Sequence, residues 1–318
     1  ERIPYRQAML DFGCDKPDLR NPLRIIDVTE IFADTEFKAF TNVVKKGGVV
    51  RAMKVKGIVD QSRKFFDDMI EFAQSVGSKG LGYIGWKDEE VRSPIAKFLN
   101  REQLDALKAA ADIESSDVLF FIADKEKQAC EIGAAVRNEL GMRLELLEPN
   151  AYRFCWIVDY PMFERDEATG KVEFSHNPFS MPQGEMEALE TKDPLEVLAY
   201  QYDLVCNGIE LSSGAIRNHK PEIMYKAFEI AGYDSSVVDN KFPGLINAFT
   251  LGAPPHGGIA PGLDRIVMLL TNQPNIREVI AFPMNQSAQD LMMNAPNEIN
   301  ERQLRELHIQ LRPMKGKK

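Results

Sequence analysis

This chain of 318 residues has few cysteines, histidines and tryptophans: four, four and two. It also has no excess of positive charge. The cysteines are far apart and form no CxxC pair, which argues against a zinc site or a disulfide framework and favours a reducing cytoplasm. Asp and Glu number 48 against 39 Lys and Arg. The resulting net charge of −9 argues against a protein that holds nucleic acid by general positive charge.

Long apolar runs are also missing. No stretch approaches the roughly 20 residues of a membrane span, and no signal peptide precedes the domain, so we expect a soluble protein without a membrane partner. The composition is that of a globular protein, with 44% hydrophobic and 27% charged residues. The chain starts at Glu1, and its first residues resemble the interior of a longer domain, which predicts a fragment or a processed product.

Short apolar strands alternate with helical patterns between residues 24 and about 145. This order indicates an α+β or an α/β domain. Asn100 and Gln103 have the spacing of a capping box at a helix start. Gly141 is expected to end the last of these helices.

A glycine-rich loop, residues 257–262, precedes a helical pattern that starts at Leu263. Apolar residues at i, i+3, i+4 and i+7 predict one buried face for this helix, with Arg265 in its first turn. An arginine at a helix N-terminus suits a bound polyphosphate better than it suits the helix dipole. Elsewhere in this half we expect a helix near 194–200, a closing strand that contains His308, and a short basic tail, KGKK.

Asn207-Gly208 is the strongest hairpin signal in the chain. A two-residue turn there pairs Val205 with Glu210. It also pairs Asp203 with Ser212, which makes Asp203 and Glu210 diagonal neighbours on one face. Two carboxylates so placed repel each other unless a cation lies between them, and their hard oxygen atoms suit Mg²⁺. For an isolated pair the alternative, two unrelated acids on a solvated hairpin, is the favoured interpretation.

Arg217 and His176 are two further candidates for substrate contact. Arg217 follows a run of small residues at the end of the second strand, where a bulge would turn it toward the same pocket as a bidentate clamp for a carboxylate. A surface arginine before a helix explains Arg217 equally well when it is considered alone. His176 lies beside an Asn-Pro turn, where a hydrogen-bonded loop histidine is the more common role.

Six blocks of sequence follow one another to the end of the chain: GCDKPDLRNP (13–22), FCWIVDYPMFE (154–164), FSHNPFSMP (174–182), GIELSSGAIRNHKPE (208–222), PPHGGIAPGLDR (254–265) and REVIAFPMNQSAQDLM (277–292). Together they resemble the bacterial-type aspartyl-tRNA synthetases, a family of class II aminoacyl-tRNA synthetases whose third motif is similar to GGIAPGLDR. The resemblance implies an α+β fold: a class II antiparallel sheet flanked by helices, with an inserted α/β GAD domain. The implied division is a catalytic segment, a GAD-like insertion and a catalytic domain with the third motif, at 1–26, 27–145 and 146–318.

The resemblance also implies roles for individual residues. The implied catalytic residues are Arg265, Glu210 and Arg217. The implied ATP-binding residues are Glu210, Gly262, Leu263, Asp264 and Arg265, with Arg265 on the γ-phosphate. The implied Mg²⁺ ligands are Asp203 and Glu210. The implied contacts of L-aspartate are Arg217, on the side-chain carboxylate, and His176.

The activity implied by the resemblance is that of a cytoplasmic aspartate–tRNA ligase. Such an enzyme activates L-aspartate with ATP to aspartyl-adenylate and transfers the aspartyl group to the 3′ end of tRNA(Asp), with tRNA(Asn) left open. The full-length enzyme is expected to be a homodimer. The first two class II motifs and the anticodon-binding domain are expected before Glu1, so the chain alone is expected to be inactive. Ser212 and Ser213, where many relatives have glycine, and Met284, where many have lysine, depart from the family pattern, and the serines put the width of the pocket in doubt.

Two alternatives stay open. The first is a non-catalytic tRNA-binding or assembly module of the amidotransferase type, which has no use for Asp203, Glu210 and Arg217. The second is a related class II ligase for asparagine or lysine. Replacement of Arg217 by leucine separates the second alternative from an aspartate ligase, because a buried arginine favours a charged carboxylate over a neutral amide.

Overall fold

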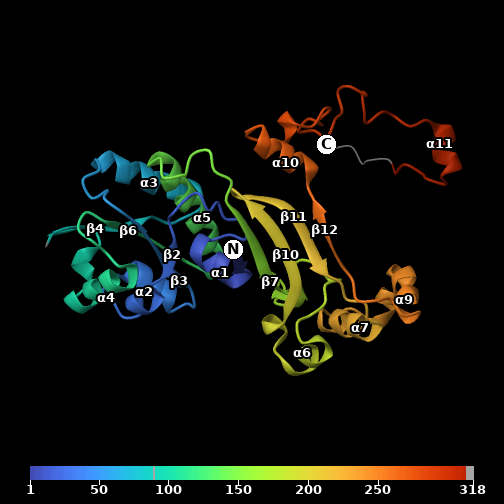
Figure 1. Cartoon of the computed structure of the whole chain (residues 1–318), viewed down its shortest axis with the longest axis horizontal. Helices are drawn as coiled ribbons and strands as arrows, with labels where there is room; N and C mark the ends of the chain where they lie inside the picture. Colours follow the sequence, from blue (N-terminus) through green and yellow to red (C-terminus); the bar gives the residue numbers. More distant parts are fainter. Residues whose placement is uncertain (89, 313–318) are drawn as a thin grey trace. The chain divides into compact units, whose positions relative to one another are not determined.

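The computed structural model describes residues 1–88 and 90–312, so the basic tail KGKK lies outside the described residues. The chain divides into two units, Glu1–Pro261 and Gly262–Lys318, and each is described by itself. In Figure 1 the first unit runs from blue to orange and the second is orange-red. Within the described residues, no helix has the length and apolar character needed to cross a bilayer.

The first unit contains two five-stranded sheets (Figure 1). The strands of the first sheet, in spatial order, are β1 (Arg2–Pro4), β7 (Phe154–Pro161), β10 (Leu198–Cys206), β11 (Ile209–Ile216) and β12 (Gly257–Pro261). β1 pairs with β7 in parallel, and the other neighbours are antiparallel. The glycine-rich segment that we predicted as a loop therefore supplies an edge strand, β12, up to Pro261.

Helix α1 (Tyr5–Phe12) packs on this sheet through Ala8 and Phe12, which share a buried cluster with Ile157 and Tyr160. The other elements around the sheet are the hairpin β8 (Phe163–Arg165) and β9 (Val172–Phe174), and the helices α6 (Glu185–Thr191), η3 (Pro194–Glu196), α7 (Pro221–Ile230), α8 (Ser235–Lys241) and α9 (Pro243–Thr250). The helix predicted near 194–200 is wrong: only one 3₁₀ turn forms, and β10 starts at Leu198. The burial of β10 alternates from residue to residue, which is the period of a strand.

The strands of the second sheet, in spatial order, are β2 (Ile25–Asp27), β3 (Val49–Val55), β6 (Val118–Asp124), β4 (Gly82–Lys87) and β5 (Glu90–Arg92). All four pairings are antiparallel, which makes this region α+β and corrects the predicted α/β insertion. β2 lies across the predicted boundary between residues 26 and 27, so this sheet includes residues assigned to the catalytic segment.

Helices cover both faces of the second sheet, and each face has its own hydrophobic cluster. The helices of this region are η1 (Thr29–Phe32), α2 (Lys38–Val44), α3 (Arg63–Ser75), η2 (Ala96–Phe98), α4 (Arg101–Ala111) and α5 (Glu126–Arg143). α3 and α5 contribute to one cluster, and α2 and α4 to the other (Figure 1). β6 supplies alternate residues to the two clusters, which explains its continuous apolar sequence.

The two helix-end predictions for this region have opposite outcomes. The capping box of Asn100 and Gln103 is confirmed at the start of α4. Gly141 does not end α5, which continues to Arg143. Instead, Gly141 allows a close approach, because an added Cβ would lie 2.4 Å from Nδ2 of Asn21.

Buried Arg137 on α5 holds the chain segment that leads into the second sheet. Its guanidinium donates hydrogen bonds to the carbonyl oxygens of Asp18, Asn21 and Leu23, at 2.9, 2.7 and 2.7 Å. Burial lowers the pKa of Arg137 to about 10. These bonds fix the backbone between α1 and β2.

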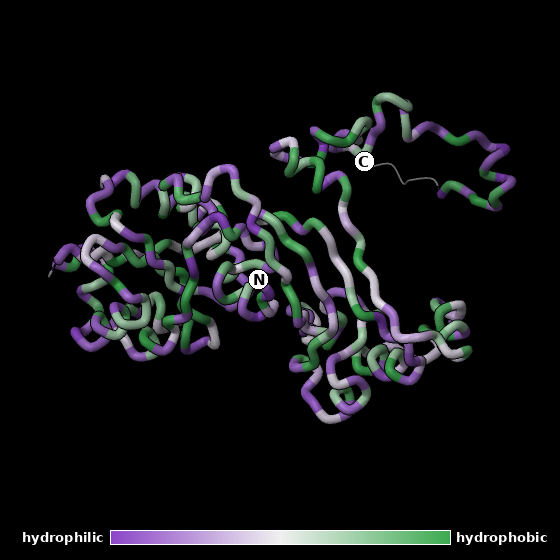
Figure 2. Tube along the Cα trace, in the orientation of Figure 1, coloured by the Kyte–Doolittle hydropathy of each residue, from purple (hydrophilic) through white to green (hydrophobic). Residues whose placement is uncertain are grey.

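The second unit contains α10 (Leu263–Leu270), η4 (Ile276–Glu278) and α11 (Glu301–Glu306). The start of α10 at Leu263 is confirmed, but its predicted buried face is not found: Met268 is buried, whereas Leu263 and Leu270 are 71% and 68% exposed. Figure 2 shows short hydrophobic and hydrophilic stretches that alternate along this unit. The predicted strand around His308 is also wrong. α11 starts at a capping box of Asn300 and Gln303 and ends at Glu306, and His308 lies in the turn after the helix.

Candidate active site

The hairpin of β10 and β11 carries the two predicted metal ligands. Asn207 and Gly208 have φ values of 52° and 83°, as a two-residue turn of type I′ requires, so the predicted turn is confirmed. Val205 pairs with Glu210 as expected. Asp203 pairs with Ser213 and not with Ser212, because the register shifts between Val205 and Leu204. This β-bulge leaves Asp203 and Glu210 on one face and separates them by one more residue along β11.

Asp203 is a buried carboxylate, with 7% of the residue exposed. Its Oδ2 atom accepts a hydrogen bond of 2.8 Å from the hydroxyl of Tyr160, which comes from the neighbouring strand β7. Burial and the charge of Asp203 raise the pKa of Tyr160, so Tyr160 keeps its proton and donates at every ordinary pH. The bond fixes the orientation of the carboxylate.

Lys16 is the cation that lies beside the acidic pair. Its Nζ atom lies 3.4 Å from Oε2 of Glu210 and 2.6 Å from Oδ2 of Asp15. Partial burial lowers the pKa of Lys16, but the hydrogen bond to Asp15 and the charges of Asp15, Glu210 and Asp203 outweigh it, so the pKa is raised. The requirement for a cation near these carboxylates is therefore met within the chain.

His176 lies on the same side as the acids. Its ring makes edge contacts with the rings of Tyr160 and Tyr5, at centroid distances of 4.8 and 5.6 Å. Its Nδ1 atom shares a hydrogen bond of 2.7 Å with the hydroxyl of Ser175. The imidazole is exposed, and so it is accessible to a small molecule.

Arg217 lines a cavity of about 370 Å³ together with Phe179, Asn218, Leu245, Phe249, His256, Gly257 and Gly258. Its Nη1 atom donates to Oδ1 of Asn177 at 3.3 Å. The described lining of this cavity includes neither Asp203 nor Glu210. Arg217 follows the end of β11, whereas Glu210 lies at its start, next to the hairpin turn. The adjacent residues 176 and 177 contact both parts, His176 through Tyr160 and Asn177 through Arg217.

Asn177 is fixed in this position from several directions. Its Oδ1 atom also accepts from the backbone N–H of Phe179, at 2.9 Å. Its carbonyl oxygen accepts from Nε2 of buried Gln201, at 3.1 Å, and the same amide donates to the hydroxyl of Ser180. An isolated backbone bridge pairs Ser180 with Arg217. The amide oxygen of Asn177 is thus held toward the guanidinium.

The two serines that depart from the family pattern lie on opposite faces of β11. Ser213 pairs with Asp203 and is exposed on the face of the acids, whereas Ser212 is buried opposite Leu204. Only Ser213 can therefore narrow the site. Beyond it, Gly214 lies so close to β12 that an added Cβ would be 2.3 Å from the carbonyl oxygen of Gly258.

Comparison of the chain with models of known protein families identifies its family. Residues 1–286 match the model of the tRNA synthetases of class II (D, K and N). The chain belongs to this family. The matched residues include the whole of the second sheet and continue past the third motif.

Three curated relatives share more than half of their aligned residues with this class II chain. The aspartate–tRNA(Asp/Asn) ligase of Zymomonas mobilis subsp. mobilis is 60% identical over 310 residues, 98% of this chain and 52% of that protein. The ligases of the same name from Rickettsia bellii and Erythrobacter litoralis are 58% and 59% identical over 98% and 97% of this chain, and over 53% and 51% of those proteins. The chain spans about half the length of the curated relatives it matches.

The third-motif residues belong to the second unit. Gly262 is the N-cap of α10, without a hydrogen bond from a capping side chain, and Leu263 and Asp264 begin the helix. The prediction that Arg265 lies in the first turn is confirmed. Met284 is 58% exposed in the same unit. The roles predicted for these residues stay predictions.

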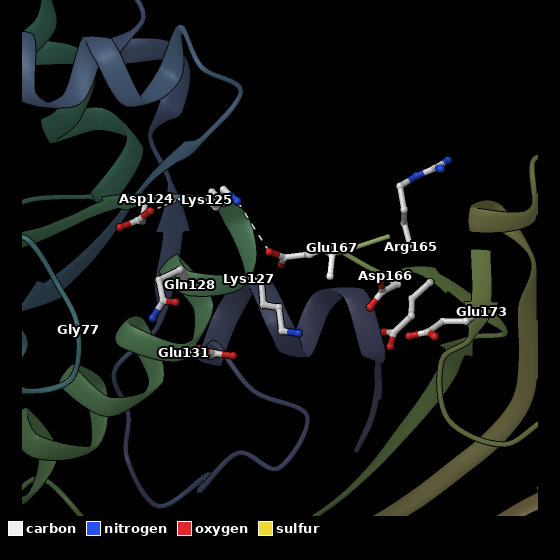
Figure 3. Close-up of a pocket in the computed structure, with 12 residues that line it drawn as sticks. Gly77, Asp124, Lys125, Lys127, Gln128, Glu131, Arg165, Asp166, Glu167 and Glu173 are labelled. Atoms are coloured by element: carbon white, nitrogen blue, oxygen red, sulfur yellow. Dashed lines mark hydrogen bonds and ion pairs between the residues drawn. The ribbon is translucent and has the colours of Figure 1, made fainter. Parts of the chain in front are cut away.

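Sequence reasoning missed a cleft of about 710 Å³ between the start of α5 and the hairpin of β8 and β9 (Figure 3). Six of its lining residues are acidic and three are basic: Asp124, Glu131, Glu164, Asp166, Glu167 and Glu173, and Lys125, Lys127 and Arg165. One ion pair crosses it, from Lys125 to Glu167 at 3.8 Å (Figure 3). Its residues come from three separate segments, at residues 77, 124–131 and 164–173, which the sequence alone does not bring together.

Sequence reasoning also assigned no role to Lys16, Tyr160 or Asn177. Lys16 and Tyr160 lie within blocks that carry the family resemblance, and Asn177 is next to His176. Regular alternation along β7 would place Tyr160 on the face opposite Ile157. The two share a buried cluster because the pairing of β7 with β10 is irregular around Asp159, whose φ is 57°. The signal was therefore present in the blocks, but its meaning depended on the sheet order.

Proposed function

We propose that this class II chain takes part in aspartate–tRNA ligation. The reaction joins L-aspartate to ATP as aspartyl-adenylate, releases pyrophosphate, and transfers the aspartyl group to the 3′ end of tRNA(Asp) and tRNA(Asn). The names of the curated relatives support both tRNAs. We include a cytoplasmic location and a homodimer of the natural-length protein in the proposal. The observation that carries it is the guanidinium of Arg217 in a cavity with Asn177 held beside it.

Arg217 supplies the selectivity for aspartate. The lining of its cavity includes the apolar side chains of Phe179, Leu245 and Phe249. A guanidinium in such a setting favours a ligand that brings a carboxylate, because a neutral amide leaves the positive charge without a counter-charge. This favours aspartate over asparagine and lysine, the other two amino acids of the family.

The first step needs no general base, because the attacking α-carboxylate of aspartate is already an anion. The chain's contribution is to hold the two substrates in line and to neutralise negative charge on the phosphates. His176 is exposed between the two parts of the site and contacts the amino acid. On the nucleotide side, Glu210, Gly262, Leu263, Asp264 and Arg265 contact ATP, with Arg265 on the γ-phosphate.

The donor chemistry of Asp203 and Glu210 fits Mg²⁺. This ion commonly binds through one or two carboxylates together with substrate phosphates and water. The Lys16 ammonium, 3.4 Å from Oε2 of Glu210, supports a cation at this position. Among the described residues, no group of three His, Cys, Asp or Glu side chains is arranged to hold a metal ion, so water or substrate phosphates would supply the further ligands. When bound, the ion neutralises charge on the phosphates.

The domain division remains part of the proposal. Residues 1–26 and 146–318 form the catalytic region, and 27–145 form the GAD-like insertion. The second sheet has an apolar cluster on each face and few buried charges, which suits a structural or tRNA-contacting role better than a catalytic one.

Aspartate-dependent exchange of pyrophosphate into ATP tests the proposal, measured with the protein in its natural length. Arg217→Leu is expected to lower kcat/KM for aspartate by about 10²- to 10³-fold, because loss of one partner from a buried charge pair typically costs about 3–4 kcal/mol. The discrimination against asparagine is expected to fall as well.

Arg153→Leu is the matched control, because this exposed arginine pairs with Glu148 at the surface. It should leave the exchange rate unchanged. If Arg217→Leu left aspartate kinetics unchanged, the ligand would be another amino acid of the family. If the unmodified protein bound tRNA but showed no exchange with any of the three amino acids, a non-catalytic tRNA-binding role would replace the ligase.

A further inference from the structure

Lys16 stands on a rigid base next to the hairpin of β10 and β11. The segment that follows it is held by the hydrogen bonds of Arg137 and by the ion pair of Arg20 with Asp18, at 2.6 Å. The hairpin turn packs against this segment, because an added Cβ at Gly208 would lie 3.8 Å from the carbonyl oxygen of Lys16. The backbone of Lys16 is therefore fixed relative to Glu210.

The end of the Lys16 side chain is less constrained than its backbone. The side chain is 37% exposed, and its ammonium lies among the carboxylates of Asp15, Glu210 and Asp203. A lysine ammonium is a compact charge on a flexible stem, so it can leave one carboxylate without moving the backbone. Asp15 remains as its partner at 2.6 Å when the contact with Glu210 is lost.

We propose that Lys16 is an internal counter-ion that competes with a divalent cation for Glu210. Without metal, its ammonium balances the charge of Glu210 and Asp203 and keeps the two carboxylates in place. When a divalent cation binds these carboxylates, the ammonium moves away from Glu210, because two cations beside one carboxylate repel each other. Lys16 is thus a positioning residue for the metal site.

The proposal predicts a gain of metal affinity on removal of the positive charge. Lys16→Met should bind MnCl₂ about tenfold more tightly in the absence of ATP, aspartate and tRNA, since a competing like charge near the site is gone. The free Mn²⁺ signal in electron paramagnetic resonance measures this directly. In metal-free buffer the variant should also unfold at a lower temperature than the wild type, and added MgCl₂ should close that gap.

Lys87→Met is the matched control. Its side chain is 39% exposed and pairs with Asp60 at 2.7 Å, away from the acids of the hairpin. It should leave Mn²⁺ affinity unchanged. Lys16→Arg keeps the charge and should behave as the wild type, and Lys16→Gln repeats the test if the methionine variant does not fold.

The double variant Lys16→Met, Glu210→Gln locates the effect. Its Mn²⁺ affinity should lose the gain of the single variant, and persistence of that gain would overturn the proposal. Unchanged or weaker Mn²⁺ binding by Lys16→Met would overturn it as well. The proposal rests on the proposed function only in the choice of Asp203 and Glu210 as metal ligands. Because the metal alone is the probe, a failure of pyrophosphate exchange would leave this result intact.

Discussion

The two five-stranded sheets bury different kinds of side chain. The second sheet has apolar clusters on both faces, and the buried polar residue within its strands is Arg51. The first sheet buries Gln201, Asp203 and Ser212 in two adjacent strands. Burial of a polar group costs free energy unless it finds partners, so such groups mark the part of the molecule with a role beyond stability. The comparison separates a structural sheet from a sheet that holds a site.

Phe121→Ala should produce the largest effect on stability. Phe121 is fully buried in β6 and contacts the rings of Phe32 and Phe40, at 5.5 and 6.3 Å. The change is expected to lower the free energy of unfolding by about 3–5 kcal/mol, as for other buried phenylalanines, while KM for aspartate stays unchanged at low temperature. Urea unfolding and pyrophosphate exchange measure the two quantities. A rise in KM for aspartate would mean that the second sheet shapes the site.

Tyr160→Phe should destabilise the first sheet by less, about 1–3 kcal/mol, because it removes the hydroxyl that donates to buried Asp203. It should also weaken Mn²⁺ binding, since the carboxylate loses its fixed orientation. Tyr83→Phe is the control from the second sheet, where the ring stacks on Phe66 and should need its hydroxyl little. Equal effects of the two variants in urea unfolding would remove the contrast between the sheets.

Asn177→Ala tests whether the amide positions Arg217. Loss of the 3.3 Å contact should raise KM for aspartate several-fold, with a smaller change in kcat, because the guanidinium is less well oriented before substrate binds. Asn177→Asp should instead inhibit aspartate binding, because a carboxylate there competes with the substrate. A lowered kcat with unchanged KM for Asn177→Ala would contradict a positioning role.

Asp27→Asn should give the smallest effect, and it concerns a charge pair of the second sheet. Burial raises the pKa of Asp27, but hydrogen bonds from Thr29 and the charge of Arg51 outweigh it, so the pKa is lowered on folding. The stabilisation is therefore present above pH 4 or so and is lost as the pH falls through the lowered pKa. Half of this side chain is exposed, so about 0.5 kcal/mol is expected at pH 7. Urea midpoints of variant and wild type should differ at pH 7 and converge at acid pH.

Local signals in the sequence predicted local structure well. Asn207-Gly208, the capping box at Asn100 and the start of α10 depend on neighbours within a few residues, and all three are confirmed. The bulge next to Glu210 was missed because it depends on how β10 and β11 pair, and not on the turn alone. The prediction for Gly141 was wrong because this glycine is needed for close contact with Asn21, which is far away in the sequence.

The candidate site was predicted in part. The face shared by Asp203 and Glu210 followed from strand alternation, but the cation beside them came from a segment about 190 residues away in the chain. Two predictions failed for a different reason, the strand around His308 and the helix near 194–200. In both, a short apolar pattern fitted a helix and a strand equally well. The contacts of Tyr160 and Asn177 required the order of the strands.

The parallel pairing of β1 with β7 has a kinetic consequence. Residues 2–4 meet residues 156–158, and the whole second sheet lies between them in the chain. The backbone of Glu148 donates to the carbonyl oxygen of Arg20, so the two ends of the intervening segment are brought together. Closing so long a loop in an unfolded chain is entropically unfavourable. The second sheet is thus expected to fold early and to bring β1 and β7 of the first sheet together, which would set the order of events during refolding.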